Sequence, residues 1–364
     1  MWAIIIILML AATVGGFIYL AARLRRFAWF SEKLKSKRRA FWAAFLILLA
    51  LLALLSLLLG IMNAMVIYLH AVLIWLICDG VGFCLRRLTR KTFRHYIAGY
   101  IAIGLTVAVL ATGCFCAFHV FRREYTVSTD NRISAPLKIA GISDSHIGTT
   151  FGWQGFQKHI ARIQEEHPDA VVIIGDFVDD STDREDMENA CRVLGTLETT
   201  YGVYYVFGNH DAGYRANERR GFDKADLTEC LEKNGVTVLE DEVVPLNGDV
   251  ALIGRADKSR RDRASIEALM AQSDRPYTVV LDHQPNDYDA EAEAGASLVL
   301  SGHTHGGQLV PINYVGKWIG ADDEIYGHHT RKNTDFIITS GISNWEFYFK
   351  TGCVSEYIIV QLIP

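Results

Sequence analysis

The 364-residue sequence lacks several features that mark common classes of protein. No two of its seven cysteines have Cys-x-x-Cys spacing, which excludes a structural zinc ribbon. It has no internal repeat and no low-complexity tract, and no basic segment precedes the first apolar stretch, so we do not expect a cleaved secretory signal peptide. Three cysteines lie outside the apolar stretches, and their number leaves one disulfide open: Cys191, Cys230 and Cys353.

The two parts of the chain have opposite net charge: acidic residues are few in the first part, and basic residues are in the minority in the second. Residues 1–131 contain four Asp and Glu against fifteen Lys and Arg, whereas residues 132–364 contain 37 Asp and Glu against 21 Lys and Arg. The acidic part has no basic stripe, and this argues against a nucleic-acid partner, because such partners require Lys and Arg to displace counterions. Bound divalent cations would reverse the acidity locally.

The first part of the chain contains long apolar stretches. Each approaches the roughly 20 residues that cross the hydrocarbon layer of a bilayer. There are four of them: Trp2–Ala22, Phe41–Leu59, Ala64–Cys84 and Ile97–Val120. We therefore expect residues 1–122 to form a membrane domain with four transmembrane helices. Within it, Asp79 lies near the basic end of its stretch and is expected to pair with Arg86 or Arg87, which follow the stretch.

The basic loops predict the orientation of this membrane domain. Segments Arg23–Arg39 and Arg86–Arg94 are rich in Lys and Arg, so both should lie in the cytoplasm. Four crossings then place the chain after residue 122 outside the cell membrane. Arg122 and Arg123 lie at this outer end, and we interpret them as an interfacial anchor near lipid phosphates.

Beyond residue 124, short β-branched and aromatic runs alternate with helical patterns, as is typical of an α/β domain. Five runs end on residues that can hold a metal ion. Because ligands at strand ends converge at one edge of a sheet, we expect a common site there. The runs are Lys138–Ser143, Ala170–Ile174, Val203–Phe207, Tyr277–Leu281 and Ser297–Leu300.

The candidate metal ligands combine carboxylate, imidazole and amide groups. They are Asp144, His146, Asp176, Asn209, His283, His303 and His305. Seven ligands exceed the needs of one tetrahedral zinc ion and suit two ions about 3.5–4 Å apart that share a carboxylate. Mixed nitrogen and oxygen donors favour Mn, Fe or Zn, and the identity of the metal stays open.

These blocks resemble the signature of the calcineurin-like metallophosphoesterases, which is D-x-H, G-D-x-x-D, G-N-H-[DE], a lone His and G-H-x-H. The matching segments are Asp144–His146, Gly175–Asp179, Gly208–Asp211, His283 and Gly302–His305. The resemblance covers residues 124–364 and implies a catalytic domain built as a four-layer α/β/β/α sandwich. Two further segments are similar to the bacterial membrane-associated subgroup, which includes phosphodiesterases and UDP-diacylglucosamine hydrolases: Leu281–Pro285 and Gly306–Gln308.

The resemblance also implies a role for each residue. Asp144, His146 and His305 would hold one ion, and Asn209, His283 and His303 the other. Asp176 would bridge the two ions. His210 would stabilise the phosphoryl oxygens and protonate the leaving group, and Asp211 would orient His210. Imidazole is the natural proton donor near neutral pH.

Several other positions have more than one interpretation. We expect Asp179 to orient neighbouring ligands, and we expect His328 and His329 to lie in a polar surface loop. Trp153 and Trp345, together with Phe347, Tyr348 and Phe349, either wall a substrate cleft or make core or membrane-facing contacts.

The function predicted from the sequence is metal-dependent hydrolysis of a phosphodiester or pyrophosphate bond at the membrane surface, with a phosphorylated small molecule or a lipid-linked compound as substrate. One alternative is hydrolysis of soluble nucleotides or glycerophosphodiesters. Another is a catalytically dead membrane sensor that binds a phosphorylated ligand. The sequence leaves the oligomeric state open.

Overall fold

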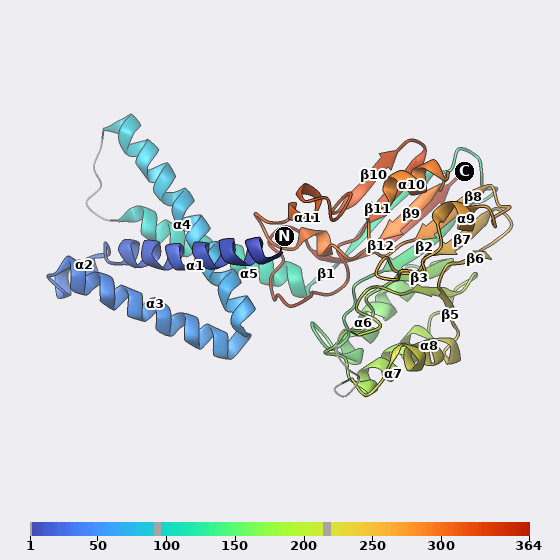
Figure 1. Ribbon diagram of the computed structural model, residues 1–364, viewed down its shortest axis with the longest axis horizontal. Helices are drawn as coiled ribbons and strands as arrows, with labels where there is room; N and C mark the ends of the chain where they lie inside the picture. Colours follow the sequence, from blue (N-terminus) through green and yellow to red (C-terminus); the bar gives the residue numbers. More distant parts are fainter. Residues whose placement is uncertain (1, 91–95, 214–219) are drawn as a thin grey trace. The chain divides into compact units, whose positions relative to one another are not determined.

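The computed structural model describes residues 2–90, 96–213 and 220–364, with the side chains of residues 2–10 and Ser31 excepted (Figure 1). The chain divides into two compact units, one ending at Thr112 and one formed by Gly113–Pro364. The division falls inside a helix, so the last turn of that helix packs with the second unit. Two residues of the second predicted basic loop, Lys91 and Arg94, lie outside the described residues.

The first unit is helical. Its helices are α1 Trp2–Leu24, α2 Ala28–Lys33, α3 Lys37–Leu59, α4 Ile61–Thr89 and the first part of α5 Ile97–Phe118. In the described part of the chain, α3, α4 and α5 are long and apolar enough to cross a membrane, and Ala11–Leu24 of α1 forms a shorter apolar helix. The fourth predicted crossing, Trp2–Ala22, therefore stays a prediction.

Asp79 has a different partner from the one that the sequence suggested. It pairs with Arg23 Nε on α1 at 2.6 Å, and it accepts hydrogen bonds from the hydroxyls of Tyr19 at 2.6 Å and Tyr96 at 2.8 Å. The predicted pairing with the arginines that follow it on α4 is wrong. Arg86 lies about 10 Å further along the same helix axis, whereas α1 passes beside Asp79.

The second unit contains two six-stranded mixed sheets. The first has the order β1-β12-β2-β3-β4-β5, and the second β10-β11-β9-β8-β7-β6. The strands of the first are β1 Val120–Ser128, β2 Leu137–Ile142, β3 Ala170–Ile174, β4 Val203–Val206, β5 Val236–Leu239 and β12 Ser355–Ile363. Those of the second are β6 Glu242–Pro245, β7 Val250–Gly254, β8 Tyr277–Leu281, β9 Leu298–Ser301, β10 Gly327–Arg331 and β11 Thr334–Ile338.

The central strands are buried on both faces, which explains their continuous apolar sequences. Residues of β2, β3, β8 and β9 form one apolar cluster between the two sheets. A second cluster lies under α6 Trp153–Gln164, α7 Arg184–Leu194 and α8 Lys224–Lys233, and a third under α9 Ile266–Met270 and α10 Tyr288–Glu293. Two short elements, η1 His305–Gly307 and α11 Val315–Trp318, complete the unit. The second unit is thus an α/β sandwich of two mixed sheets (Figure 1).

One segment that was predicted as a loop is a strand. His328 and His329 were expected in a polar loop, but they lie in β10, which pairs antiparallel with β11. As an edge strand with partly exposed side chains, β10 has no apolar pattern to reveal it. His328 Nε2 pairs with Asp335 at 2.7 Å, and His329 Nε2 lies 2.9 Å from the carbonyl of Tyr326.

Two further predictions can be compared with the fold: the lipid anchor at Arg122 and the possible disulfide. Arg122 lies in β1 and pairs with Glu124 and Glu166, both at 2.7 Å. Its role as a lipid anchor stays a prediction. All seven cysteines are free thiols. The thiol of Cys191 donates to Met187 Sδ at 3.9 Å, and the neighbouring Cys230 together with burial raises the pKa of Cys191.

Candidate metal centre

The predicted ligands lie at the carboxyl ends of strands from both sheets. Asp144 and His146 follow β2, Asp176 follows β3, and Asn209 follows β4. His283 follows β8 of the second sheet, and His303 and His305 follow β9. Parallel strands bring their carboxyl ends to the same edge, so residues distant in sequence meet there.

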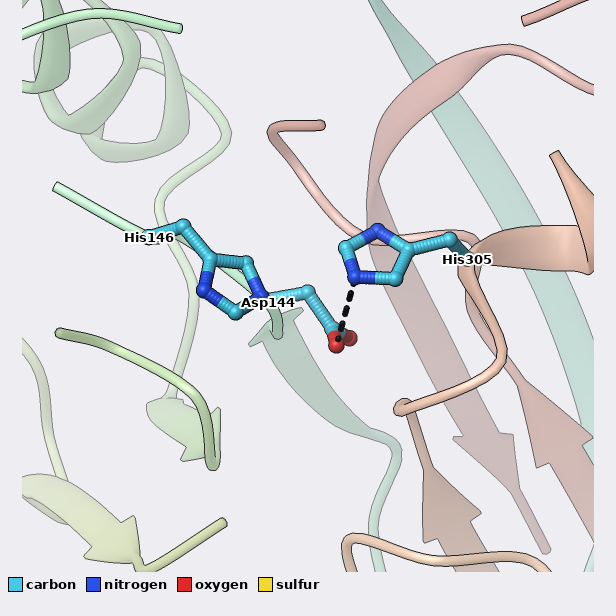
Figure 2. Close-up of side chains that lie close together, drawn as sticks. All are labelled: Asp144, His146 and His305. Carbon is cyan, nitrogen blue, oxygen red and sulfur yellow. Dashed lines mark ion pairs between the residues drawn. The ribbon is translucent and has the colours of Figure 1, made fainter. Parts of the chain in front are cut away.

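The first group contains Asp144, His146 and His305. All three are buried, and one potential ligand atom from each lies within 4.8 Å of the others. His305 Nε2 is 3.5 Å from Asp144 Oδ1, as the dashed line in Figure 2 shows. The imidazole rings of His146 and His305 are stacked with their centroids 5.3 Å apart.

The second group contains Asp176, His283 and His303, again with ligand atoms within 4.8 Å of one another. His283 Nε2 lies 3.1 Å from Asp176 Oδ2. His146 Nε2, which belongs to the first group, lies 3.9 Å from the same oxygen. Asp176 therefore stands between the two groups, where a bridging carboxylate would have to lie. Asn209 is half-buried and directly precedes His210, and its role as a ligand stays a prediction.

Five of the predicted ligands have a left-handed backbone conformation. The φ values are 52° at Asp144, 38° at His146, 51° at Asp176, 69° at His303 and 48° at His305. A non-glycine residue in this region costs on the order of 1–3 kcal/mol, and such residues concentrate at functional sites. The fold thus holds these side chains inward at the expense of backbone strain.

Two glycines of the motifs allow the backbone to approach the carboxylates closely. A Cβ atom at Gly208 would lie 2.2 Å from Asp176 Oδ1, and one at Gly302 would lie 2.5 Å from Asp144 Oδ2. Any larger residue would displace a candidate ligand. This requirement gives a physical reason for glycine directly before Asn209 and His303.

Neighbouring groups fix the orientation of the imidazoles. Asp179 Oδ2 lies 3.1 Å from His146 Nδ1, as expected of a residue that orients a ligand. The carbonyl oxygen of Ile174 lies 2.7 Å from His283 Nδ1. Each contact leaves Nε2 directed into the site, and His146 Nε2 is buried without a hydrogen-bond partner in the described part of the chain. Such second partners are usual for metal-binding histidines.

The electrostatics also favour divalent cations. Burial raises the pKa of Asp144 and Asp176, but the neighbouring imidazoles outweigh it, so the net effect lowers both values. Burial lowers the pKa of His305 to about 3. At neutral pH the site therefore presents ionised carboxylates and a neutral imidazole at His305, which is the protonation state that binds metal. Burial lowers the pKa of His146 and His283, but the carboxylates of Asp179 and Asp176 outweigh it and raise both values, so a bound metal would displace a proton from each ring. The donor set fits two metal ions.

Asp211 holds the ligand loops together. Its carboxylate accepts hydrogen bonds from the backbone N–H groups of Asp176, Val178 and Gly208 at 2.9, 3.0 and 2.6 Å. Burial and the charge of Asp176 raise its pKa to about 6. This structural role was not anticipated from the sequence, and the predicted orientation of His210 by Asp211 stays a prediction.

His210 lies beside the two groups. Its backbone N–H donates to Asp176 Oδ1 at 2.8 Å, and its ring centroid is 5.2 Å from that of His146. The ring of Trp345 lies 5.5 Å away on a loop from the other end of the chain. Trp153, by contrast, packs against the core of the first sheet. Trp345 therefore lies beside the site, whereas Trp153 packs against the core.

An ion-pair network beneath the site was missed at the sequence level. Arg255 is buried and pairs with Asp282, Asp287 and Glu291 at 2.9, 2.9 and 3.0 Å. Asp282 directly precedes His283, so the network supports the end of β8. Arg255 itself follows β7, and no periodicity or motif distinguishes it from a surface arginine.

Comparison with known proteins agrees with this geometry. Residues 137–307 match the family described as calcineurin-like phosphoesterase. The chain is 28% identical over 233 residues to an uncharacterized metallophosphoesterase of Campylobacter jejuni, with 62% of this chain and 59% of that protein covered. A metallophosphoesterase of Helicobacter pylori is also 28% identical, with 64% and 62% covered. The chain thus spans about three fifths of the length of these relatives.

Two further similarities are with proteins from Danio rerio. A transmembrane protein with a metallophosphoesterase domain is 31% identical over 185 residues, which cover 48% of this chain and 42% of that protein. A solved dimetal phosphatase covers 56% of this chain and 87% of its own, with a TM-score of 0.37 and 12% identity.

Proposed function

We propose that the second unit is a calcineurin-like metallophosphoesterase domain that hydrolyses a phosphodiester or pyrophosphate bond with two divalent ions. The observation that carries the proposal is the position of Asp176. One oxygen of this carboxylate lies 3.1 Å from His283 Nε2 and 3.9 Å from His146 Nε2, so it can serve both groups of ligands.

Two bound divalent cations would activate a water molecule and neutralise phosphate charge. The chain's own residues have the complementary tasks. In this proposal Asp144, His146 and His305 hold one ion, Asn209, His283 and His303 hold the other, and Asp176 bridges them. His210 lies next to Asp176, where its imidazole can donate a proton to the leaving oxygen of a substrate.

A lipid-linked substrate is favoured by the surroundings of His210. Asn344 Nδ2 donates a hydrogen bond to the carbonyl of Ala117, in the last turn of the candidate membrane helix α5, at 3.1 Å. The next residue, Trp345, has its ring 5.5 Å from that of His210. One loop therefore contacts both a candidate membrane helix and the proposed proton donor, which would suit a phosphate group attached to a lipid.

We also propose that the catalytic unit faces outward. The basic segment Arg23–Arg39 supports a cytoplasmic loop, and Arg122 contributes little opposing charge because Glu124 and Glu166 pair with it. Protease treatment of intact cells should remove the domain if this orientation holds. Full protection of a tag attached after Pro364, in cells whose surface is accessible, would refute it.

The activity can be tested with the full-length chain in lipid nanodiscs. After chelation it should be inactive, and Mn²⁺ or Zn²⁺ should restore hydrolysis of a phosphodiester. A panel of a lipid-linked pyrophosphate, a soluble nucleotide and a glycerophosphodiester distinguishes the substrates. Turnover of the soluble compounds alone would reject the lipid-linked class. Metal binding without turnover of any compound would favour a sensor.

A further inference from the structure

The end of helix α5 is built into the catalytic unit. Lys350 N donates to the carbonyl of Gly113 at 2.9 Å, and Ser355 Oγ and Asn344 Nδ2 donate to the carbonyl of Ala117 at 2.8 and 3.1 Å. A Cβ atom at Gly113 would lie 2.8 Å from a methyl carbon of Thr351, so the contact requires a residue without a side chain. The loop before β12 is therefore attached to the helix at two successive turns.

This attachment fixes the depth of the loop. The candidate span Ile97–Phe118 ends at the catalytic unit. With a rise of about 1.5 Å per residue, Gly113 lies about 7 Å below the end of the helix. If α5 crosses the bilayer, the backbone bonded to Gly113 must lie at the depth of the headgroups or just beneath them, because the polar layers at the two faces of a bilayer together account for only about 10–15 Å of its thickness.

A second segment packs on this loop and exposes large apolar side chains. Val310 N donates to Thr351 Oγ1 at 3.1 Å, which joins the segment Val310–Trp318 to the loop. Within the segment, Trp318 is 72% exposed, Ile312 55% and Tyr314 51%. The rings of Tyr314 and Trp318 lie 6.3 Å apart.

The exposed surface continues onto the helix itself. Tyr348, in the loop, lies 6.0 Å from the ring of Phe118, the last residue of α5, and both are exposed. The segment Val310–Trp318 contains no acidic residue and one lysine, Lys317, which pairs with Glu324 at 2.6 Å. Tryptophan and tyrosine beside aliphatic residues, without negative charge, are typical of the boundary between headgroups and acyl chains.

We propose that the surface formed by Val310, Ile312, Tyr314, Trp318 and Tyr348 is inserted in the interfacial layer of the same bilayer leaflet in which α5 ends. Its occupant is lipid and not a second protein, because the surface is continuous with the exposed face of a candidate transmembrane helix and is attached to it by hydrogen bonds. This inference rests on α5 crossing the membrane and does not depend on the proposed hydrolysis.

The inference can be tested by photocrosslinking in vesicles of phosphatidylethanolamine and phosphatidylglycerol. The photoreactive residue p-benzoylphenylalanine replaces Trp318, Tyr314 or Ile312 in the full-length chain, one position at a time. Phe118 is the positive control at the end of α5. Glu232 is the negative control: it is exposed on α8, which lies beside β5 at the edge of the first sheet opposite β1.

We expect covalent lipid adducts at Trp318, Tyr314 and Ile312 with yields similar to that at Phe118, and little or none at Glu232. Adducts at Phe118 without adducts at the three segment positions would overturn the proposal. Adducts that join two copies of the chain would also overturn it, because the surface would then be a protein interface. Absence of lipid adducts at Phe118 as well would remove its premise. All labelled positions are exposed, and unchanged thermal unfolding would confirm that each variant is folded.

Discussion

Asp79 in the helical unit, with 13% of its side chain exposed, and the buried Asp176 in the second unit are neutralised differently. A permanent cation and two hydroxyl groups satisfy the carboxylate of Asp79: Arg23, Tyr19 and Tyr96. Asp176 faces the imidazole nitrogens of His283 and His146 at 3.1 and 3.9 Å. The carboxylate of Asp79 is neutralised entirely by groups of the protein, and these contacts stabilise the fold. The carboxylate of Asp176 lies among converging imidazoles, an arrangement that is suited to a bound metal cation.

The backbone shows the same contrast. Asp79 lies within the regular helix α4, while Asp176, with φ of 51°, and four other candidate ligands occupy the left-handed region. The helical cluster thus forms without backbone strain. The cluster at the strand ends forms with strain that only a function would retain.

The largest effect should come from Asp176→Ala. Loss of the carboxylate between the two groups should lower metal content and reduce phosphoesterase activity by roughly 10³-fold or more, since the charge stabilisation that the metal ions provide is worth several kcal/mol. Metal analysis and initial rates on the same preparation check this. Normal metal content in this variant would remove Asp176 from the centre.

His210→Ala should separate metal binding from catalysis. We expect metal content to stay unchanged and the rate to fall by about 10²–10⁴-fold, because a positioned proton donor is lost and no ligand is removed. His328→Ala, which removes an exposed imidazole from β10, is the matched control and should keep full activity. If the His210 variant loses metal, this histidine is a ligand and its proposed role is wrong.

Asp179→Ala should give an intermediate effect. Without the partner of Nδ1, His146 is less well oriented, and metal affinity should fall by about 10–100-fold. Competition with a chelator measures the affinity. Glu185→Ala removes an exposed carboxylate from the neighbouring helix α7 and should leave the affinity unchanged. If both substitutions lowered the metal affinity equally, Asp179 would act only through its negative charge and not by orienting His146.

The smallest effect on the metal centre should come from Asp79→Asn. Arg23 would lose its ionic partner, so we expect a loss of about 1–3 kcal/mol in the stability of the helical unit. Metal content and the rate per folded molecule should not change. Thermal unfolding in nanodiscs, followed by metal analysis, tests both expectations, and a loss of metal would show that the contrast between the two carboxylates is false.

The sequence predicted the strands with most success where both faces are buried. The runs before Asp144, Asp176 and His283 are continuous and apolar, and the structure has β2, β3 and β8 there. The edge strand β10 was missed because its exposed side chains carry no apolar signal. The ends of an apolar helix were also predicted closely, since the stretch Ile97–Val120 corresponds to α5, Ile97–Phe118.

Hydrogen bonds between residues that only the tertiary structure brings together could not be predicted from the sequence. The motif placed Asp211 beside His210, but only the fold shows that its carboxylate holds the backbone of Asp176 and Gly208. The contact of Asn344 with Ala117 joins residues far apart in sequence. No periodic pattern encodes such a contact, because it depends on how the loop before β12 returns to the end of α5.

Manganese titration followed by electron paramagnetic resonance tests the central claim most directly. The full-length chain, freed of metal, receives Mn²⁺ in increasing amounts. If Asp176 joins two ions, binding should saturate at about two ions per chain, spaced as in known dinuclear sites, and give an exchange-coupled spectrum that Asp176→Ala abolishes. Saturation at one ion, or a spectrum of isolated Mn²⁺ at saturation, would contradict a shared dinuclear centre.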